Sequence, residues 1–423
     1  MNKRLRAKAK IQRDKERKSQ KRLCEQPKYE DVFTIKNFVS VLPKCRVNVS
    51  WKSSVQKYFI KPIRRFYNDY KTLNEYKLPR PISDKVITIW ERGKARTITP
   101  IHVKDRVIQK VLCDYALVPI LTKTLIYDNG ASMKGKGISF SRNRMAHHLM
   151  SAVKEYGIDF YVLTYDFKSY FDSIPHRTCR MILEKHILDK HIVDISMEVV
   201  KSPYRAQIEK MKNESERKEM LLKLENDELC GICLGSQVSQ ILALVVASDI
   251  DHYIKDTMRF KHYIRYMDDG VVIAKTKEEL QVLYLGMIEI ANKIGLQFND
   301  RKTRIAPIRR GFQFLKIKYF ISDTGKIIRK LTRNGILRER RKLKKLAAKV
   351  RRSELTIDCA YESMQSWVAH SKFADGYITR RNMMKLYNQL FDGYRISRRW
   401  KRRNRRELLQ ADKWSAYRWC CDG

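Results

Sequence analysis

The sequence predicts an α+β fold in which short antiparallel strands carry acidic residues and longer helices flank them. Residues 159–166, DFYVLTYD, alternate like a half-buried strand and end on an acid. Residues 262–274, HYIRYMDDGVVIA, form two β-rich runs around a tight acidic turn, which is typical of a hairpin. Apolar residues recur at helical spacing in 103–121 and 235–254, and a strongly basic helix is predicted from residue 331 onward.

The N-terminal part divides into a basic arm and a lead-in. Residues 1–23 contain eleven Lys and Arg residues with no apolar run behind them, so we expect a solvated arm rather than a signal peptide. Residues 24–85 mix aromatic residues with lysines and predict irregular helices. Residues 86–100, VITIWERGKARTITP, follow as two short strands around a glycine turn.

Helices are predicted in much of the remaining chain. Residues 174–188 have helical spacing, and residues 205–229 are densely charged with a sparse apolar stripe, which predicts a solvent-facing helical excursion. Residues 363–391 contain further helical segments. The chain is therefore expected to comprise a basic arm with its lead-in, a central α+β region, a helical region and a basic aromatic tail, at residues 1–84, 85–325, 326–395 and 396–423.

The charge of the chain indicates a polyanionic partner. Lys and Arg number 89 against 46 Asp and Glu, which gives a formal net charge of +43. Because the excess is spread through the whole chain, we expect nucleic acid rather than an anionic membrane, and we expect the N-terminal arm to become ordered on RNA. No apolar run reaches the roughly 20 residues that span a bilayer, so no membrane partner is expected.

The cysteines favour a reducing, cytoplasmic location. Nine are scattered along the chain, and only Cys230 and Cys233 form a CxxC pair. No second CxxC or histidine pair completes a zinc site. We therefore expect reduced thiols and no structural zinc.

Three acids have the pattern of a catalytic centre. Asp166 ends a predicted strand, and Asp268 and Asp269 lie at the tip of the later hairpin. Nucleotidyl transfer by two metals needs carboxylates that hold two Mg²⁺ ions about 3.5–4 Å apart. Adjacent acids are more often a solvated turn, but here apolar, β-branched flanks would hold the tip rigidly at a sheet edge. The three acids are therefore the candidate metal site.

The residues around these acids resemble the motifs of reverse transcriptases. Tyr266-Met267-Asp268-Asp269 is similar to their YxDD box, and residues 166–171, DFKSYF, to their first palm motif. Five further segments resemble family motifs and follow in the same order as in the family. GKARTITP with DRVIQ (93–109) and GASMKGKG (130–137) resemble the two fingers blocks, and CLGSQVSQ (233–240) resembles the palm helix. GLQFNDRKTRI (295–305) resembles the lysine motif, and GFQFLKIKYF (311–320) resembles the primer-grip hairpin. The resemblance covers about residues 85–380 and is greatest for the prokaryotic branch, which includes group II intron, diversity-generating and defence-associated enzymes.

The resemblance implies a right-hand polymerase, with fingers and an antiparallel palm sheet in residues 85–325 and a helical thumb in 326–395. It also implies an RNA-directed DNA polymerase that makes cDNA from an RNA template and dNTPs. Two Mg²⁺ ions would be the cofactors, with Mn²⁺ as an alternative. Asp166 and Asp268 would bind the metals with help from the Phe167 carbonyl, and Asp269 would support their charge.

The family motifs also imply roles for residues around the incoming nucleotide. Lys302 would stabilise or protonate the pyrophosphate, and Phe171 would be a steric gate against a ribose 2′-OH. Lys94 and Arg96 would neutralise the triphosphate. The remaining candidates are Leu234, Gly235 and Gln240 for the dNTP, and Lys134, Lys136, Tyr266 and Met267 for the nucleic acid. Structural roles stay open at this stage: a core aromatic at 171, a surface lysine at 302 and a plain loop at 130–137.

Two departures bear on the biological role. Intron-type enzymes read QGxxxSP at the palm helix, whereas this chain has Leu234 in place of the glutamine and Gln240 in place of the proline. That form resembles diversity-generating and some defence-associated enzymes. Second, because the sequence ends soon after the expected thumb, we expect no DNA-binding and endonuclease domains like those of an intron protein.

The expected role is antiviral defence in a bacterium or phage, with a dedicated noncoding RNA as template. One alternative is an error-prone enzyme of a diversity-generating retroelement. Another is a catalytically inactive RNA-binding scaffold, against which the intact acids argue. A homo-oligomer or a small accessory protein is left open.

Overall fold

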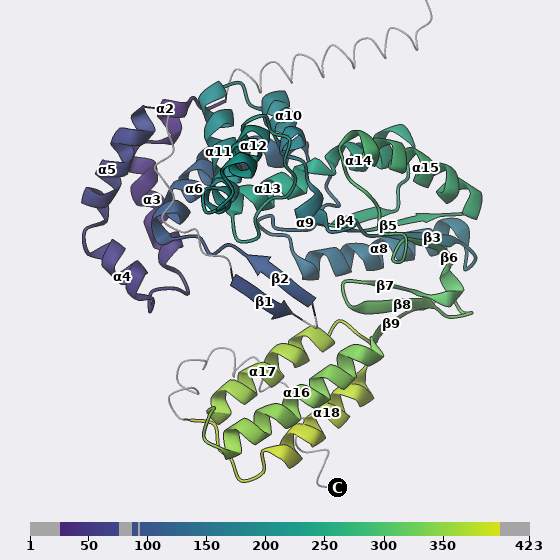
Figure 1. Cartoon of the computed structure of the whole chain (residues 1–423). Helices are drawn as coiled ribbons and strands as arrows, with labels where there is room; N and C mark the ends of the chain where they lie inside the picture. The colour runs from purple at the N-terminus through teal and green to yellow at the C-terminus, as the bar shows by residue number, and fades with distance from the viewer. Residues whose placement is uncertain (1–25, 76–86, 92–93, 398–423) are drawn as a thin grey trace, which may run out of the picture. The chain divides into compact units, whose positions relative to one another are not determined.

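The computed structural model describes residues 26–75, 87–91 and 94–397 (Figure 1). The expected basic arm and most of the C-terminal tail lie outside these ranges. The described residues form two compact units. The first contains the residues up to His148 and Leu163–Ile305, and the second contains Leu149–Val162 and the residues from Ala306 onward. The domain boundaries expected from the sequence remain predictions.

The lead-in is helical, as expected, and packs around aromatic residues. Its helices are α2 (Tyr29–Val32), α3 (Ile35–Arg46), α4 (Ser53–Ile60) and α5 (Pro62–Asn74). Phe38 on α3 stacks on Phe66 on α5, and both rings are buried. The Tyr29 hydroxyl donates a hydrogen bond to the Leu73 carbonyl at 2.7 Å. These contacts join α2, α3 and α5 into one small layer.

The two strands expected in residues 86–100 are present. Strands β1 (Ile87–Glu91) and β2 (Lys94–Ile98) pair antiparallel, with Ile87 opposite Ile98. Helix α6 (Val103–Leu112) follows, and its Val107, Val111 and Leu112 side chains are buried. The helix then continues through a π-helical turn into α7 (Val118–Leu121), so the expected helix 103–121 is confirmed with a local distortion.

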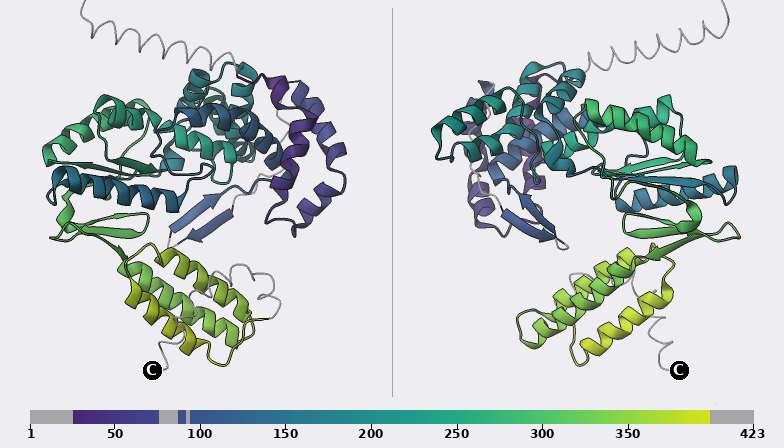
Figure 2. Two further views of the ribbon diagram at one scale, coloured as in Figure 1. Left: turned by 180° about the vertical axis from the view of Figure 1, so that it is seen from behind. Right: turned by 45° about the vertical axis from the view of Figure 1, so that its right-hand side comes forward.

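A four-stranded sheet in the order β4-β5-β3-β6 carries both expected acidic strand ends. Helices α14 and α15 cover one of its faces (Figures 1 and 2). The bounds of these elements are β3 (Tyr161–Tyr165), β4 (Tyr263–Tyr266), β5 (Asp269–Ala274), β6 (Arg304–Pro307), α14 (Ser248–His252) and α15 (Lys277–Lys293). Strand β6, α15 and the long helix α8 (Ile138–Tyr156) were not among the expected elements.

The central helices are α9 (Tyr170–Ser173), α10 (His176–His186), α11 (Lys190–Ile208), α12 (Glu214–Glu225) and α13 (Gln237–Val246). Helix α12 is largely exposed, with Leu224 as its buried residue, which agrees with the solvent-facing excursion. At its base, however, the buried Lys201 ammonium pairs with the buried Asp227 carboxylate at 2.7 Å. The single helix expected over 235–254 is wrong: the chain turns at Ala247, between α13 and α14.

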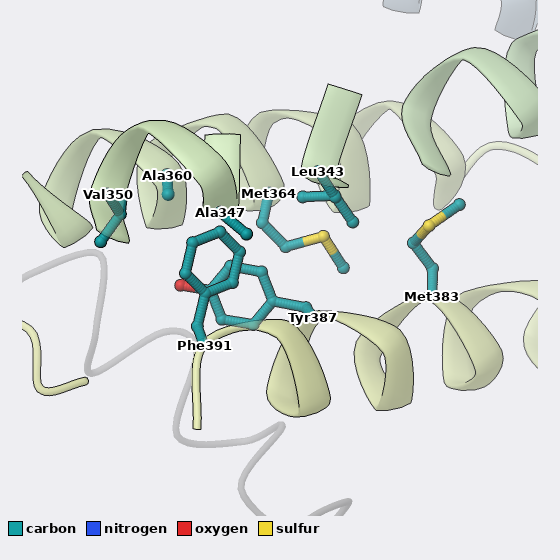
Figure 3. Close-up of a cluster of buried hydrophobic side chains, with 8 residues drawn as sticks. All are labelled: Leu343, Ala347, Val350, Ala360, Met364, Met383, Tyr387 and Phe391. Carbon is teal, nitrogen blue, oxygen red and sulfur yellow. The ribbon is translucent and has the colours of Figure 1, made fainter. Parts of the chain in front are cut away.

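The second unit contains a small sheet and a bundle of three helices. Strands β7 (Phe312–Phe314), β8 (Ile317–Ile321) and β9 (Ile327–Leu331) pair antiparallel in that order, and the first two form the expected hairpin. The helices are α16 (Arg333–Arg351), α17 (Ile357–Ser371) and α18 (Tyr377–Leu390). They enclose an apolar core of Leu343, Ala347, Val350, Ala360, Met364, Met383, Tyr387 and Phe391 (Figure 3).

The class predicted from the sequence is therefore confirmed. The described chain contains antiparallel strand pairs and separate runs of helices, as in an α+β fold. Among the described helices, none combines the length and the apolar character needed to cross a lipid bilayer.

Candidate active site

Asp166 lies directly after β3, at the end of a buried strand. The residue is 5% exposed. Its backbone carbonyl accepts a hydrogen bond from the Asn299 amide at 2.8 Å, and the Lys168 amide donates to the Gln297 carbonyl at the same distance. The segment before Lys302 therefore lies beside the acid and fixes its backbone.

The hairpin β4–β5 places the other two acids next to this strand. Tyr266 pairs with Asp269, so Met267 and Asp268 form a two-residue turn. Met267 has a φ of +56°, a left-handed conformation that costs free energy in a residue with a side chain. Such positive φ values are typical of tight hairpin turns. Because β5 is the neighbour of β3 in the sheet, Asp269 emerges beside Asp166.

Gly270 allows the two strands to approach. A Cβ atom there would lie 2.1 Å from the ring of Tyr165, the residue before Asp166. No side chain fits in that space, so glycine is required if the Tyr165 ring is to stay in place. The contact brings the residues that adjoin Asp166 and Asp269 together.

The carboxylates of the site repel one another. Burial, and then the negative charge of Asp166, raise the pKa of Asp268. Burial, followed by the charges of Asp268 and Asp166, raises the pKa of Asp269 to about 7. Both side chains are also in hydrogen-bond contact with Asp166. Three carboxylates therefore lie close together, and the ionised forms of Asp268 and Asp269 are destabilised there.

Lys302 is the cation that contacts this cluster. Its ammonium donates a hydrogen bond to Oδ2 of Asp166. Burial lowers the pKa of Lys302, but the bond to Asp166 and the attraction of Asp269 and Asp268 outweigh that effect and raise it overall. The lysine side chain is half exposed, so it can move toward another anion at little cost.

A divalent cation suits this set of oxygen donors. Hard ions such as Mg²⁺ prefer carboxylate and carbonyl oxygens, and a positive ion would offset the repulsion among the acids. Asp166, Asp268 and Asp269 are the residues that could hold such ions, with the Phe167 carbonyl next to them. Within residues 26–75, 87–91 and 94–397, no group of three or more His, Cys, Asp or Glu side chains already has the arrangement of a metal site.

Phe171 lies five residues after Asp166 in the short helix α9 and is half-buried. Its ring meets the Tyr170 ring edge-on, with 5.9 Å between centroids. Its carbonyl accepts a hydrogen bond from the Ile232 amide at 2.8 Å, and the Gly231 amide donates to the Ile174 carbonyl at 2.8 Å. The backbone of Phe171 is therefore held by the loop that leads to Leu234.

The same loop joins the end of β2. The Thr99 amide donates to the Leu234 carbonyl at 3.2 Å. Gly235 has a φ of +115°, and a Cβ there would lie 2.8 Å from the Thr99 carbonyl oxygen. Glycine is thus needed at this close approach. Leu234 is half-buried and Gln240 is exposed on α13. The structure brings Phe171, Leu234 and Gly235 together along one connected backbone path.

The basic candidates of the fingers have different surroundings. The Lys94 side chain lies outside the described part of the chain. Arg96 is exposed on β2, opposite Ile89, and Lys134 is exposed in its loop. Lys136 instead donates to the backbone carbonyls of Tyr127 and Asn129, at 2.6 and 3.1 Å, and so holds its own loop in shape. Tyr266 and Met267 are half-buried at the hairpin.

Sequence reasoning missed the buried charged pair behind the hairpin. Arg265 and Asp251 are each 0% exposed, and Nη2 of Arg265 lies 2.6 Å from Oδ2 of Asp251. A signal was present, because each charge interrupts an apolar run that was expected to be buried. Such residues are almost never fully buried unless they are paired.

The chain is similar to several known proteins. The chain is 23% identical over 290 residues to protein YkfC of Escherichia coli (strain K12), a match that covers 58% of this chain and 66% of that protein. It is also similar to the solved structure of apo telomerase from Candida tropicalis, with 14% identity and a TM-score of 0.41 over 58% of this chain and 54% of that one. A second similar structure is telomerase from Candida albicans with a fragment of telomeric RNA, with 12% identity and a TM-score of 0.40 over 77% of this chain and 59% of that one. This chain thus spans less than two thirds of the length of each.

A family model decides the affiliation. The model described as reverse transcriptase (RNA-dependent DNA polymerase) matches residues 82–319, more than half of the chain. The matched range contains the hairpin, Asp166, Phe171, the Leu234–Gly235 loop and Lys302. The α+β fold and the acidic two-residue turn beside the end of β3 agree with this match. The chain therefore belongs to the reverse transcriptase family.

Proposed function

We propose that this chain is an active RNA-directed DNA polymerase that extends a primer with dNTPs on an RNA template, using two Mg²⁺ ions. The observation that carries the proposal is the cluster of Asp166, Asp268 and Asp269, in which burial and the neighbouring negative charges raise the pKa of Asp268 and Asp269. Two divalent ions would offset those charges and clamp the attacking and leaving oxygens. Mn²⁺ has similar oxygen-ligand preferences and would substitute.

The proposal assigns the following roles to the surrounding residues. Asp166 and Asp268 would bind the metal ions together with the Phe167 carbonyl. The negative charge of Asp269 would support the metal ions electrostatically. Lys302, which is half exposed, would stabilise or protonate the pyrophosphate. Lys94 and Arg96 contact the triphosphate, Phe171 excludes a 2′-OH, and the backbone at Gly235 approaches the nascent base pair. Leu234 stands where related enzymes have a polar contact to the dNTP, and Gln240, Lys134, Tyr266 and Met267 complete the substrate and nucleic-acid surface. Lys136 instead holds the shape of the loop that carries Lys134, because its ammonium donates to two backbone carbonyls of that loop.

The basic helix α16 supports binding of the template–primer duplex. Its buried stripe contains Leu343, Ala347 and Val350, and its one carboxylate, Glu339, is 8% exposed. Burial raises the pKa of Glu339. The solvent side of the helix is therefore cationic, through Arg333, Arg338, Arg340, Arg341, Lys342, Lys344, Lys345, Lys349 and Arg351. A helix with this charge suits contacts with phosphates.

Neutralising one side of α16 should weaken duplex binding and make the affinity less dependent on salt. Arg341, Lys345 and Lys349 are exposed at a spacing of four residues and share one face. If each neutralises one phosphate, the triple change to Gln should reduce the slope of log affinity against log salt by about 2–3. Fluorescence anisotropy of a labelled RNA–DNA duplex across a KCl series measures the slope.

A matched control separates α16 from the general charge of the chain. Lys190, Lys212 and Lys293 are also exposed but lie on the first unit. Changing these three to Gln removes the same charge. Equal slopes for the two triple variants would contradict a specific role for α16.

The proposed biological role is antiviral defence in the cytoplasm of a bacterium, with the enzyme copying a dedicated noncoding RNA. The departures at Leu234 and Gln240 support this role, and they suit an error-prone diversifying enzyme equally well. Sequencing the nucleic acids that co-purify with the wild-type enzyme and with an Asp268→Ala variant tests the proposal. One noncoding RNA with complementary cDNA from the wild type alone supports defence, mutated copies of a repeat support diversification, and RNA without cDNA from both supports a scaffold.

A further inference from the structure

A fully buried carboxylate lies behind the candidate metal site. Asp251 on α14 is 0% exposed. Its Oδ1 accepts hydrogen bonds from Nε of Arg265 at 2.7 Å and from the Tyr263 hydroxyl at 2.6 Å, and its Oδ2 accepts from Nη2 of Arg265 at 2.6 Å. Taking both charges out of water is costly, and an apolar pair of similar volume is often as stable. A role beyond stability would account for the pair.

One branch of this cluster reaches the acidic turn. Nη1 of Arg265 donates to the Met267 carbonyl at 2.9 Å, and Nη2 also donates to the Leu244 carbonyl at 2.8 Å. Met267 is the turn residue with the positive φ, and Asp268 follows it. The guanidinium therefore ties the strained turn to α13 and to Asp251, so the turn cannot relax without breaking a buried, charge-assisted bond.

A second branch reaches the strand that carries Asp166. The Tyr263 hydroxyl is 2.6 Å from the Tyr165 hydroxyl, and both rings are buried. Tyr165 immediately precedes Asp166, and its ring fills the space above Gly270. Asp251 is thus connected by side-chain hydrogen bonds to the residue before one metal-site acid and, through Arg265, to the residue before another.

We propose that Asp251, Arg265, Tyr263 and Tyr165, together called the Asp251 cluster, are positioning residues that set the separation of Asp166 from Asp268 and thereby the affinity for divalent metal. The inference rests on the proposed metal role of these acids. Metal sites tolerate errors of only about 0.2 Å in ligand distance. Outer partners that orient ligands commonly change metal affinity or activity by about 10–100-fold when they are removed.

The rigid geometry explains why a charged cluster is used. Asp268 and Asp269 are buried beside Asp166, and the negative charges of the three acids repel one another. A guanidinium makes several directed hydrogen bonds in a fixed plane, which packing of apolar side chains does not provide. The Asp251 cluster holds the acids at metal-binding distance against their repulsion.

The test removes one hydroxyl and measures metal binding directly. Tyr263→Phe breaks the link between Asp251 and Tyr165 while keeping the ring. Tyr29→Phe is the matched control, because its hydroxyl is also buried and bonded, to the Leu73 carbonyl in the first unit. Free Mn²⁺ in a titration of each full-length protein is measured by electron paramagnetic resonance, and melting curves are recorded in parallel. We expect Tyr263→Phe to weaken Mn²⁺ binding at least about tenfold and Tyr29→Phe to leave it unchanged, with similar losses of Tm.

A second variant and a reference complete the experiment. Arg265→Lys keeps the charge but cannot reach Asp251, Leu244 and Met267 together, so its Mn²⁺ affinity should fall at least as far. Unchanged Mn²⁺ affinity in Tyr263→Phe, while Asp268→Ala abolishes binding, would overturn the positioning role and leave the metal site intact. If Asp268→Ala itself binds Mn²⁺ like the wild type, the metal assignment fails, and the positioning role fails with it.

Discussion

Replacing Asp268 and Asp269 together by Ala should abolish dNTP incorporation, to less than about 1% of the wild-type rate. Without them, Asp166 alone cannot hold two metal ions, and the clamp on the reacting oxygens is lost. Duplex affinity should be nearly unchanged, because it depends on the cationic surface, and two fewer negative charges do not weaken it. Single-nucleotide extension on an RNA template and anisotropy with the same duplex measure the two quantities.

The same variant should melt no earlier than the wild type without divalent ions. Burial and mutual repulsion raise the pKa of both acids in the folded state, so at neutral pH their charged forms destabilise it. Asp249→Ala with Glu278→Ala is the control, because it removes two exposed carboxylates from the same unit. The two acids would be excluded as the metal site if the double variant kept dNTP incorporation well above 1% of the wild-type rate. They would also be excluded if the control variant lost dNTP incorporation to the same extent.

The local part of this site could be predicted from the sequence. Alternating strands and a two-residue acidic turn depend on neighbours within a few positions, so the ends of β3 and the β4–β5 hairpin were found. The lateral order of the strands depends on long-range packing. That order, β4-β5-β3-β6, is what brings Asp269 beside Asp166, and only the resemblance to a family implied it.

Other features were missed although the sequence contains a signal for each. Helix α15 has a clear start, since Thr276 and Glu279 form a capping box and Leu280, Leu283 and Met287 follow at helical spacing, so its signal was present. The break at Ala247 was also missed, although the polar residues Ser248 and Asp249 directly follow the apolar run that ends there.

The Asp251 cluster shows a similar limit. The sequence shows that Arg265 and Asp251 each lie among apolar residues, but it does not show that they meet across fourteen positions. Lys136 is the converse case. Its position among glycines suggests a phosphate contact, whereas the folded loop turns its ammonium toward two of the loop's own carbonyls. In both cases the backbone path decides the role of the charge.

Phe171→Ala should raise the efficiency of rNTPs relative to dNTPs at least about tenfold, and up to about 100-fold. Phe171 lies five residues after Asp166. The Ile232 amide holds the backbone carbonyl of Phe171, and this contact does not depend on the side chain. A 2′-OH that meets the ring would displace the α-phosphate from the metals, and small displacements of reacting atoms cost on the order of 100-fold in rate. Removing the ring relieves that clash, so the gain should come from better use of rNTPs.

A structural role for Phe171 predicts a different result. The ring is half-buried against Tyr170, and loss of a core phenylalanine typically costs about 3–5 kcal/mol and harms both substrates alike. Phe171→Tyr keeps the ring and should keep the selectivity, and Phe373→Ala removes another half-buried ring, from the second unit. Extension with each of the four dNTPs and rNTPs is measured beside melting curves for all three variants. If Phe171→Ala melts early and loses both activities in proportion, as a destabilised Phe373→Ala would, the ring belongs to the core and the selection of the sugar lies elsewhere.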